Sequence, residues 1–221
     1  MTKETNVSCR SGHYVCDACH NGTANDLIER YCSNADSVSP LSLAITLMKN
    51  PSVKMHGSEH HFLVSAVLLA AFYNGTNAEK GVVGEKIREA RKRAEEVKGE
   101  FSGFQGACGA AIGTGIFMSL VTGATPLSDR ERKFSNMVTA ESLRVIAGNG
   151  GARCCKRESF WAIITAVKFV KMEFKVVLSL KLPAPCAFTA LNRECLKERC
   201  RFYRFDAMSI NSCSKGILHA G

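Results

Sequence analysis

The N-terminal segment places cysteine and histidine side chains at spacings typical of metal ligands. Residues 9–20 read CRSGHYVCDACH, in which a Cys-x2-Cys pair follows two further donors. Such a pair lets two thiolates of one tight turn bind the same ion, and two more donors complete a tetrahedron. We therefore expect residues 1–35 to form a small knuckle that binds zinc, with iron or an iron–sulfur cluster as the alternative. The simplest ligand set is Cys9, His13, Cys16 and Cys19.

A second group of cysteines lies in the C-terminal third, where CAFTALNRECLKERC spans residues 186–200. Cys186, Cys195 and Cys200 either complete the N-terminal metal site or form a second one, and the sequence leaves both alternatives open. Cys32 follows a short helical run and is a candidate to replace one of the first two N-terminal ligands. All four are therefore candidate metal ligands.

Cys108 lies in an uncharged, glycine-rich stretch, Phe101–Ser128. Gly109 and Gly113 fall at helical spacing, and small residues four apart let another backbone approach closely. We therefore expect this stretch to be a buried central helix with Cys108 at its N-terminal end. Because a helix N-terminus favours anions, that position predicts a lowered thiol pKa and a reactive or metal-binding sulfur.

The vicinal pair Cys154 and Cys155 stands at another predicted helix start, in the basic sequence RCCKR. Arginine and lysine neighbours favour thiolates, so at least one of these cysteines is a candidate reactive residue or ligand. His60 is the leading histidine candidate, because it lies in the first turn of an apolar helix that begins after Ser58. The alternative for His60 is a structural hydrogen bond to a buried carbonyl. The candidate catalytic set is Cys108, Cys154, Cys155 and His60.

The elements that must position these residues are mainly helices. Helix starts are predicted at Ser39–Pro40, at Ser58 and at the capping-box pattern Ser128–Glu131. Residues 174–182, FKVVLSLKL, alternate enough to predict one strand. We expect a mainly α fold, a compact helical bundle around the buried glycine-rich helix, with the cysteine-rich knuckle as an appendage. The expected parts are the knuckle over 1–35, a helical core over 36–173, a cysteine-rich segment over 174–203 packing on the core or knuckle, and a poorly ordered tail over 204–221.

Composition narrows the class of protein. With 221 residues and 46% hydrophobic side chains, the chain can bury one core. Eleven cysteines without an apolar signal at the start predict a reducing cytoplasm, where clustered thiols bind metal or do redox work. The glycine-rich stretch contains Gln105 and lacks aromatic belts, so we expect no membrane span. Residues 150–221 hold 13 basic and 5 acidic side chains but no dense basic run with aromatics, so nucleic acid is not the expected partner.

Several of these motifs resemble a known family. The runs MKNPSVKMHGSEHHFLVSAVLLAAFYN, KIREARKRAEEVKGEFSGFQGACGAAIGTGIFMSLVTGATPLS, GGARCCKR and NRECLKERCRFY are similar to the uncharacterised microbial family catalogued as domain of unknown function 5714. The resemblance covers nearly all of residues 9–203 and implies a cysteine-rich, mainly helical domain, found alone or beside methyltransferase or radical-SAM domains. Residues 106–111 are also similar, more loosely, to the C-GCAxxG-C-C redox proteins. The family pattern carries cysteine where this chain has Ser102, which puts a dithiol reaction between that position and Cys108 in doubt.

Two functional hypotheses follow. In the first, Cys108, His60 and one of the vicinal cysteines converge at helix ends and form a metal- or thiol-based redox site. In the second, zinc bound by the terminal cysteines is structural, and the helical body is a non-catalytic accessory module for a partner enzyme. By analogy with the family, that partner is expected to be a methyltransferase or a radical-SAM protein.

Overall fold

The computed structural model describes residues 23–180 and 186–203. Within these residues lie eight α-helices and no strand, and the β pairing is limited to an isolated bridge between Cys186 and Tyr203. The mainly helical fold class is therefore confirmed. The helices are α2 (Ala24–Asn34), α3 (Pro40–Met48), α4 (Glu59–Gly75), α5 (Lys80–Glu95), α6 (Phe101–Phe104), α7 (Gly109–Thr122), α8 (Arg130–Asn149) and α9 (Cys155–Phe174), followed by the short 3-10 helices η1 (Thr189–Leu191) and η2 (Lys197–Arg199).

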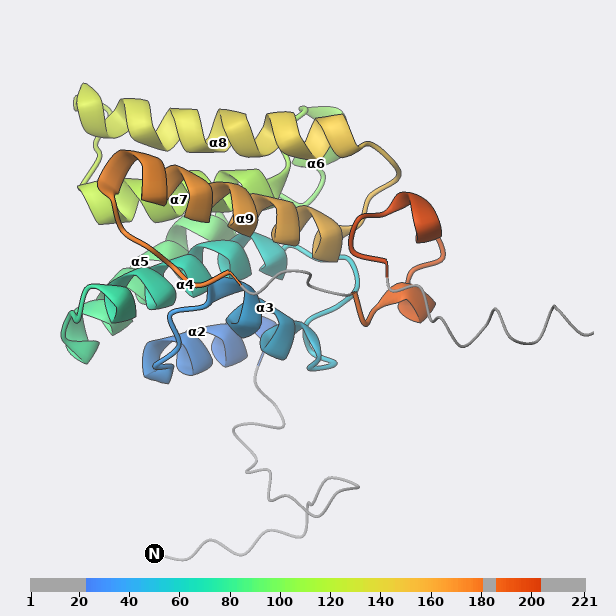
Figure 1. The fold of residues 1–221 in the computed structure, drawn as a ribbon, viewed down its shortest axis with the longest axis horizontal. Helices are drawn as coiled ribbons and strands as arrows, with labels where there is room; N and C mark the ends of the chain where they lie inside the picture. Colours follow the sequence, from blue (N-terminus) through green and yellow to red (C-terminus); the bar gives the residue numbers. More distant parts are fainter. Residues whose placement is uncertain (1–22, 181–185, 204–221) are drawn as a thin grey trace, which may run out of the picture.

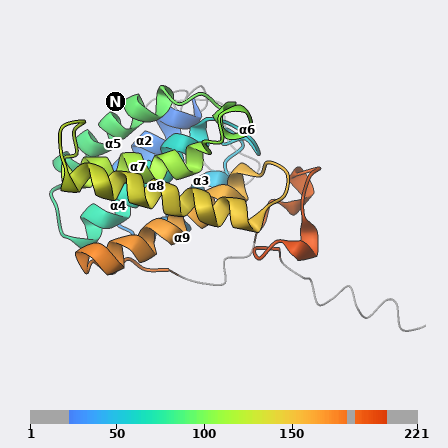
Figure 2. The same cartoon turned by 90° about the horizontal axis from the view of Figure 1, so that it is seen from above.

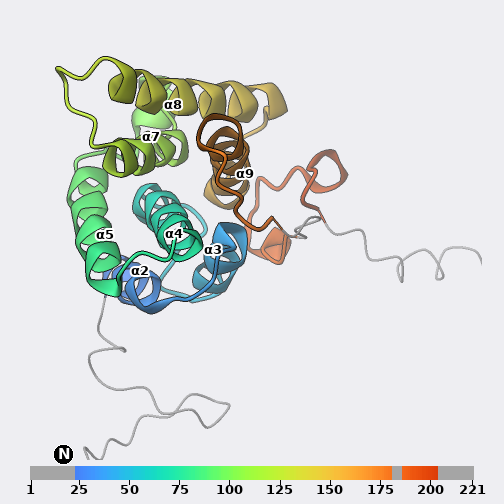
Figure 3. The ribbon, with the colours of Figure 1, turned by 60° about the vertical axis from the view of Figure 1, so that its left-hand side comes forward.

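Helix α4 occupies the centre of the bundle. Figure 3 shows α2, α3, α5, α7 and α9 arranged around it, and all five contact it. Every residue from His60 to Phe72 is buried, because a helix that is apolar on all sides needs neighbours on all sides. The glycine-rich helix, expected at the centre, instead lies between α4 and α8 (Figure 1).

The glycine-rich stretch Phe101–Ser128 forms two helices instead of one. The chain turns between α6 and α7, where Gly106 has a φ of +66°, and α7 ends at Gly123 with a φ of +71°. Left-handed backbone of this kind costs glycine little, so the residue type that suggests close helix packing also interrupts the helix. The expected burial is found within α7, where it extends from Gly109 to Leu120.

A predicted helix cap is found at one of three positions. Ser39 caps α3 through its hydroxyl, and Pro40 is the first helical residue, as predicted. Ser58 precedes α4 but makes no side-chain capping bond. The capping box predicted at Ser128 is absent, because Asp129 is the residue before α8 and its side chain makes no capping bond.

A capping box that the sequence pattern did not reveal starts α2. The Thr23 hydroxyl accepts a hydrogen bond from the Asp26 amide (3.2 Å), and the Asp26 carboxylate accepts one from the Thr23 amide (2.8 Å). We expect Thr23→Ala to lower the free energy of unfolding by about 1 kcal/mol, measured by urea denaturation. Ser58→Ala, at a helix start without such a bond, is the control and should change it by less than about 0.5 kcal/mol. Equal losses in the two variants would contradict the cap.

Most of the predicted N-terminal knuckle, residues 1–35, lies outside the described residues, as does the tail over 204–221. The part of the knuckle that is described, α2, packs against α4 and α5. Its buried side chains are Ile28 and Cys32, so this stretch belongs to the helical body.

The segment after α9 does not form the predicted strand. The helix runs to Phe174, Lys175 takes a φ of +59°, and residues 175–180 have no regular structure. Leu178 is nevertheless buried against the core. The strand predicted over 174–182 is therefore wrong for the residues that the structure describes, and the rest of that stretch lies outside them.

Residues 186–203 form a loop that packs beside the start of α9 (Figures 1 and 2). The Cys186 amide donates a hydrogen bond to the Phe202 carbonyl (2.6 Å), which closes the loop on itself. The Phe202 ring packs against Phe160 (5.2 Å between ring centroids) and Trp161 (4.8 Å). These contacts fix the C-terminal cysteines against the helical body.

The longest of the described helices, α8 and α9, have 20 residues each and carry several charged side chains. None of the described helices combines the length and the apolar composition that a bilayer crossing requires.

Candidate functional site

The N-terminal ends of α4, α7 and α9 meet around a small pocket, which we call the thiol pocket. Helix α4 contributes two histidines of its first turn, α7 the cysteine just before its first residue, and α9 a cysteine and a glutamate. Three residues singled out from the sequence, Cys108, Cys155 and His60, thus line one pocket. Its functional side chains are His60, His61, Cys108, Arg153, Cys155 and Glu158.

Cys108 has a higher thiol pKa than its position at a helix start predicts. Its thiol donates a hydrogen bond to Oε2 of Glu158 (3.5 Å), and its side chain is buried. Burial raises the pKa of Cys108 to about 12, and the negative charge of Glu158 adds to the rise. Amides in the first turn of α7 lower the pKa, but by less. The prediction of a lowered pKa at this thiol is therefore wrong.

Cys155 lies in a different electrostatic environment of the same pocket. The Arg153 guanidinium donates a hydrogen bond from Nε to the Cys155 sulfur (3.4 Å). Cys155 is also the first residue of α9, where the helix dipole is positive. The Cys155 sulfur therefore lies beside a positively charged group, whereas the Cys108 sulfur lies beside a carboxylate.

Glu158 connects the cysteines at the starts of α7 and α9. Its Oε1 accepts a hydrogen bond from the Cys154 amide (3.2 Å) and lies 3.7 Å from the Arg157 guanidinium, while Oε2 accepts from the Cys108 thiol. These partners hold a buried carboxylate beside a thiol proton. Glu158 was not predicted as a site residue from the sequence. Its position in the first turn after an N-cap cysteine could have indicated it, because a carboxylate there can reach the free amides at the helix end.

His60 and His61 each place one ring nitrogen on a backbone carbonyl. Nδ1 of His60 lies 3.2 Å from the Gly57 oxygen, and Nδ1 of His61 lies 3.1 Å from the Val97 oxygen. Because carbonyls only accept, Nδ1 is the protonated nitrogen in both rings, and Nε2 is left as an acceptor. Burial lowers the pKa of His60 to about 3 and also lowers that of His61. Among the described residues, Nε2 of His60 is buried without a hydrogen-bond partner.

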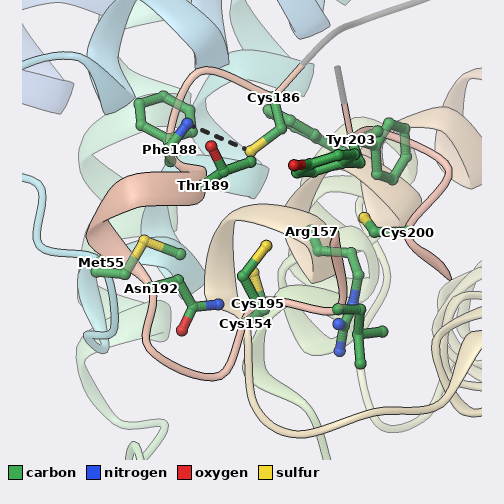
Figure 4. Close-up of a pocket in the computed structure, with 13 residues that line it drawn as sticks. Met55, Cys154, Arg157, Cys186, Phe188, Thr189, Asn192, Cys195, Cys200 and Tyr203 are labelled. Carbon is green, nitrogen blue, oxygen red and sulfur yellow. Dashed lines mark hydrogen bonds between the residues drawn. The ribbon is translucent and has the colours of Figure 1, made fainter. Parts of the chain in front are cut away.

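A second pocket lies between the start of α9 and the loop 186–203 (Figure 4). Helix α9 supplies one cysteine through its N-cap and the loop supplies three, so we call it the four-cysteine pocket. Met55 and three phenylalanines form much of the remaining wall, and Arg157 also lines it. The four cysteines are Cys154, Cys186, Cys195 and Cys200.

Backbone amides donate to two of these four sulfurs. The Phe188 amide lies 3.4 Å from the Cys186 sulfur, and the Lys197 amide lies 3.4 Å from the Cys195 sulfur. Bonds of this kind stabilise a thiolate or a metal-bound sulfur. Burial acts in the opposite direction, since it raises the pKa of Cys154 to about 11 and also raises that of Cys186.

The two vicinal cysteines line different pockets. Cys154 lines the four-cysteine pocket, whereas Cys155 lines the thiol pocket. Consecutive positions on a helix point about 100° apart, so neighbours in the sequence can serve different sites. The two pockets therefore share the start of α9.

The structure describes one further predicted metal ligand, Cys32, and it lies in neither pocket. Cys32 is fully buried in the apolar core, and burial raises the pKa of its thiol. In the described part of the chain, no three His, Cys, Asp or Glu side chains lie close enough together to hold a single metal ion. Cys9, His13, Cys16 and Cys19 lie outside the described residues.

Comparison with known proteins gives one match. The model of a family described as a family of unknown function (DUF5714) matches residues 28–203, which include both pockets. No curated protein and no solved structure matches the chain.

Proposed function

Since the chain belongs to this family of unknown function, we propose a role from its own residues: it is a cysteine-based redox protein that acts in the thiol pocket. The reacting pair is Cys155 and Cys108. The observation that carries the proposal is that two thiols from different helices line one pocket, one beside Arg153 and the other beside Glu158. Thiols that differ in this way suit the two successive steps of thiol–disulfide exchange.

In the first step, the Cys155 thiolate attacks one sulfur of a disulfide co-substrate. A mixed disulfide forms, the disulfide bond of the co-substrate breaks, and its second sulfur leaves as a thiolate. Arg153 favours this step because its guanidinium stabilises the attacking thiolate in a buried place.

In the second step, Cys108 resolves the mixed disulfide. Glu158 accepts the Cys108 proton, and the new thiolate attacks the Cys155 sulfur and releases the second thiolate of the co-substrate. The protein then holds a Cys108–Cys155 disulfide, and the co-substrate has gained the two electrons and takes up protons. Because burial and Glu158 raise the pKa of Cys108 to about 12, its thiol is protonated at neutral pH, and the carboxylate has to take the proton as the sulfur attacks.

Two further side chains of the thiol pocket support Cys108 and Cys155 as the reacting pair. Ser102 lines it at the position where the family resemblance implies cysteine, so in this chain Cys155 supplies the partner of Cys108. His60 is neutral, and its Nε2 can accept a hydrogen bond from a thiol at this site.

We expect mild oxidation of the full-length protein with diamide to form a disulfide between Cys108 and Cys155, identified by peptide mass spectrometry. Cys155→Ser should abolish this disulfide and leave Cys108 free for alkylation. Cys32→Ala is the matched control, because Cys32 is buried away from both pockets and its variant should still form the disulfide.

Two outcomes would contradict the proposal. One is a wild-type protein whose Cys108 remains fully alkylatable after oxidation. The other is a disulfide that joins Cys154 to Cys155. Either result would favour the alternative function, a zinc-stabilised accessory module without catalysis whose partner is a methyltransferase or a radical-SAM protein.

A further inference from the structure

We propose that the four-cysteine pocket binds a four-iron iron–sulfur cluster through Cys154, Cys186, Cys195 and Cys200. The proposal stands on this pocket alone and does not depend on thiol exchange in the neighbouring one. It assigns the three C-terminal cysteines and the first vicinal cysteine to one site, without a ligand from the N-terminal segment.

The fold gathers the four donors from two segments. The hydrogen bond from the Cys186 amide to the Phe202 carbonyl closes the loop, and Cys186 and Cys200, near its two ends, both line the pocket. Cys195 lies between η1 and η2, and Cys154 is the N-cap of α9. Four soft sulfur donors without a harder ligand select zinc or an iron–sulfur cluster.

The arrangement of the four cysteines around one pocket fits a cluster better than a single ion. Zinc in such a site needs all four sulfurs about 2.3 Å from one point. Within residues 23–180 and 186–203, no three cysteine, histidine or acidic side chains approach closely enough for that. In a four-iron cluster each cysteine binds a different iron, so the sulfurs surround a larger body. Four cysteines that line one pocket without meeting at one point fit this arrangement.

The surroundings suit an anionic centre at the edge of the core. Met55, Phe160 and Phe188 form apolar parts of the pocket wall, while Arg157 lines it with a positive charge. The buried Lys156 ammonium lies over the Phe188 ring (5.0 Å from its centroid) and close enough to Cys154 to interact with its charge. Four thiolates around a cluster carry net negative charge, so these cations offset part of it.

The test is to purify the full-length chain anaerobically, reconstitute it with iron and sulfide, and measure iron, acid-labile sulfide and zinc per chain. We expect about four iron and four sulfide, with a broad absorption band near 400 nm that is bleached by dithionite. Cys195→Ser and Cys200→Ser should each reduce the bound iron by more than about fivefold.

Two control variants separate this site from its neighbours. Cys155→Ser changes the residue next to a proposed ligand but lies in the other pocket, so its iron content should equal that of the wild type. The double variant Cys16→Ser/Cys19→Ser should also retain the cluster. Since Cys155→Ser removes the proposed thiol exchange and keeps the cluster, failure of one proposal is distinguishable from failure of the other.

Three results would overturn the cluster. The first is a wild-type protein that takes up no iron and sulfide, which does not depend on any variant folding correctly. The second is zinc in place of iron, lost in the same variants. The third is iron that disappears when Cys16 and Cys19 are changed and stays when Cys195 is changed.

Discussion

Lowering the pH from about 7 to about 4 is expected to destabilise the fold by about 3 kcal/mol through His60 alone. Burial lowers the pKa of His60 to about 3, whereas an unperturbed histidine titrates at 6.5. Below pH 6.5 the unfolded chain therefore binds a proton that the folded chain does not bind until about pH 3. The stability of the folded state is unaffected by His60 above pH 6.5 and falls progressively between these two values.

The surroundings of His60 explain why its protonated form is so unfavourable. The ring is 1% exposed, and the charges of Lys156, His61 and His56 act against a further positive charge after burial itself. The Glu59 carboxylate lies 3.9 Å from Nδ1, and the Gly57 carbonyl accepts from that nitrogen. Both favour the protonated ring, but they do not offset the loss of water around a buried charge.

His60→Asn isolates this effect. The asparagine amide can donate to the Gly57 carbonyl as Nδ1 does, but it does not titrate. Urea unfolding curves of the two proteins should therefore converge as the pH falls, with the wild type losing about 3 kcal/mol more than the variant by about pH 4. Parallel pH profiles would show that His60 is not buried in its neutral form.

Helices were predictable where a pattern has one physical interpretation. The apolar run after Ser58 has no polar side, so it had to be a buried helix, and serine followed by proline marks the start of α3. A glycine in the sequence can indicate either close helix packing or a turn, and in Phe101–Ser128 glycines serve both purposes. The alternation in 174–182 suggested a strand, but a strand needs a partner, and the described residues offer none.

The sequence predicted the positions of the candidate site residues better than it predicted their pKa values. Cys108, Cys155 and His60 were all predicted near helix starts, and these starts meet. The low pKa expected for Cys108 was wrong because a helix end contributes about 0.3–1 kcal/mol, less than burial beside a carboxylate. Glu158 carries no local motif, so its charge could not enter that prediction.

The sequence also could not predict that Cys154 and Cys155 line different pockets. In the sequence the two thiols are equivalent, because both stand between the same basic residues. Their assignment depends on which direction each takes from the first turn of α9 and on the loop 186–203 packing beside one of them. One helix start thereby serves a pair of thiols on one side and a sulfur-lined pocket on the other.

Gly113→Ala is expected to lower the free energy of unfolding by about 3 kcal/mol. A Cβ atom there would lie 2.6 Å from the backbone oxygen of His61 and 3.1 Å from Cβ of Val64. Neither atom can move aside like the end of a flexible side chain, so α7 must move away from α4. The same shift displaces Cys108, which directly precedes α7, and diamide should then form the Cys108–Cys155 disulfide more slowly.

Gly148→Ala on α8 is the matched control for this contact. An added Cβ at Gly148 would have no neighbouring atom within 4 Å, so the helix should gain about 0.5 kcal/mol from the loss of glycine. Urea denaturation of both variants should therefore give effects of opposite sign. Stabilisation by both changes would mean that α4 and α7 can separate without cost, and the close approach at Gly113 would then not be what holds the histidines and Cys108 in one pocket.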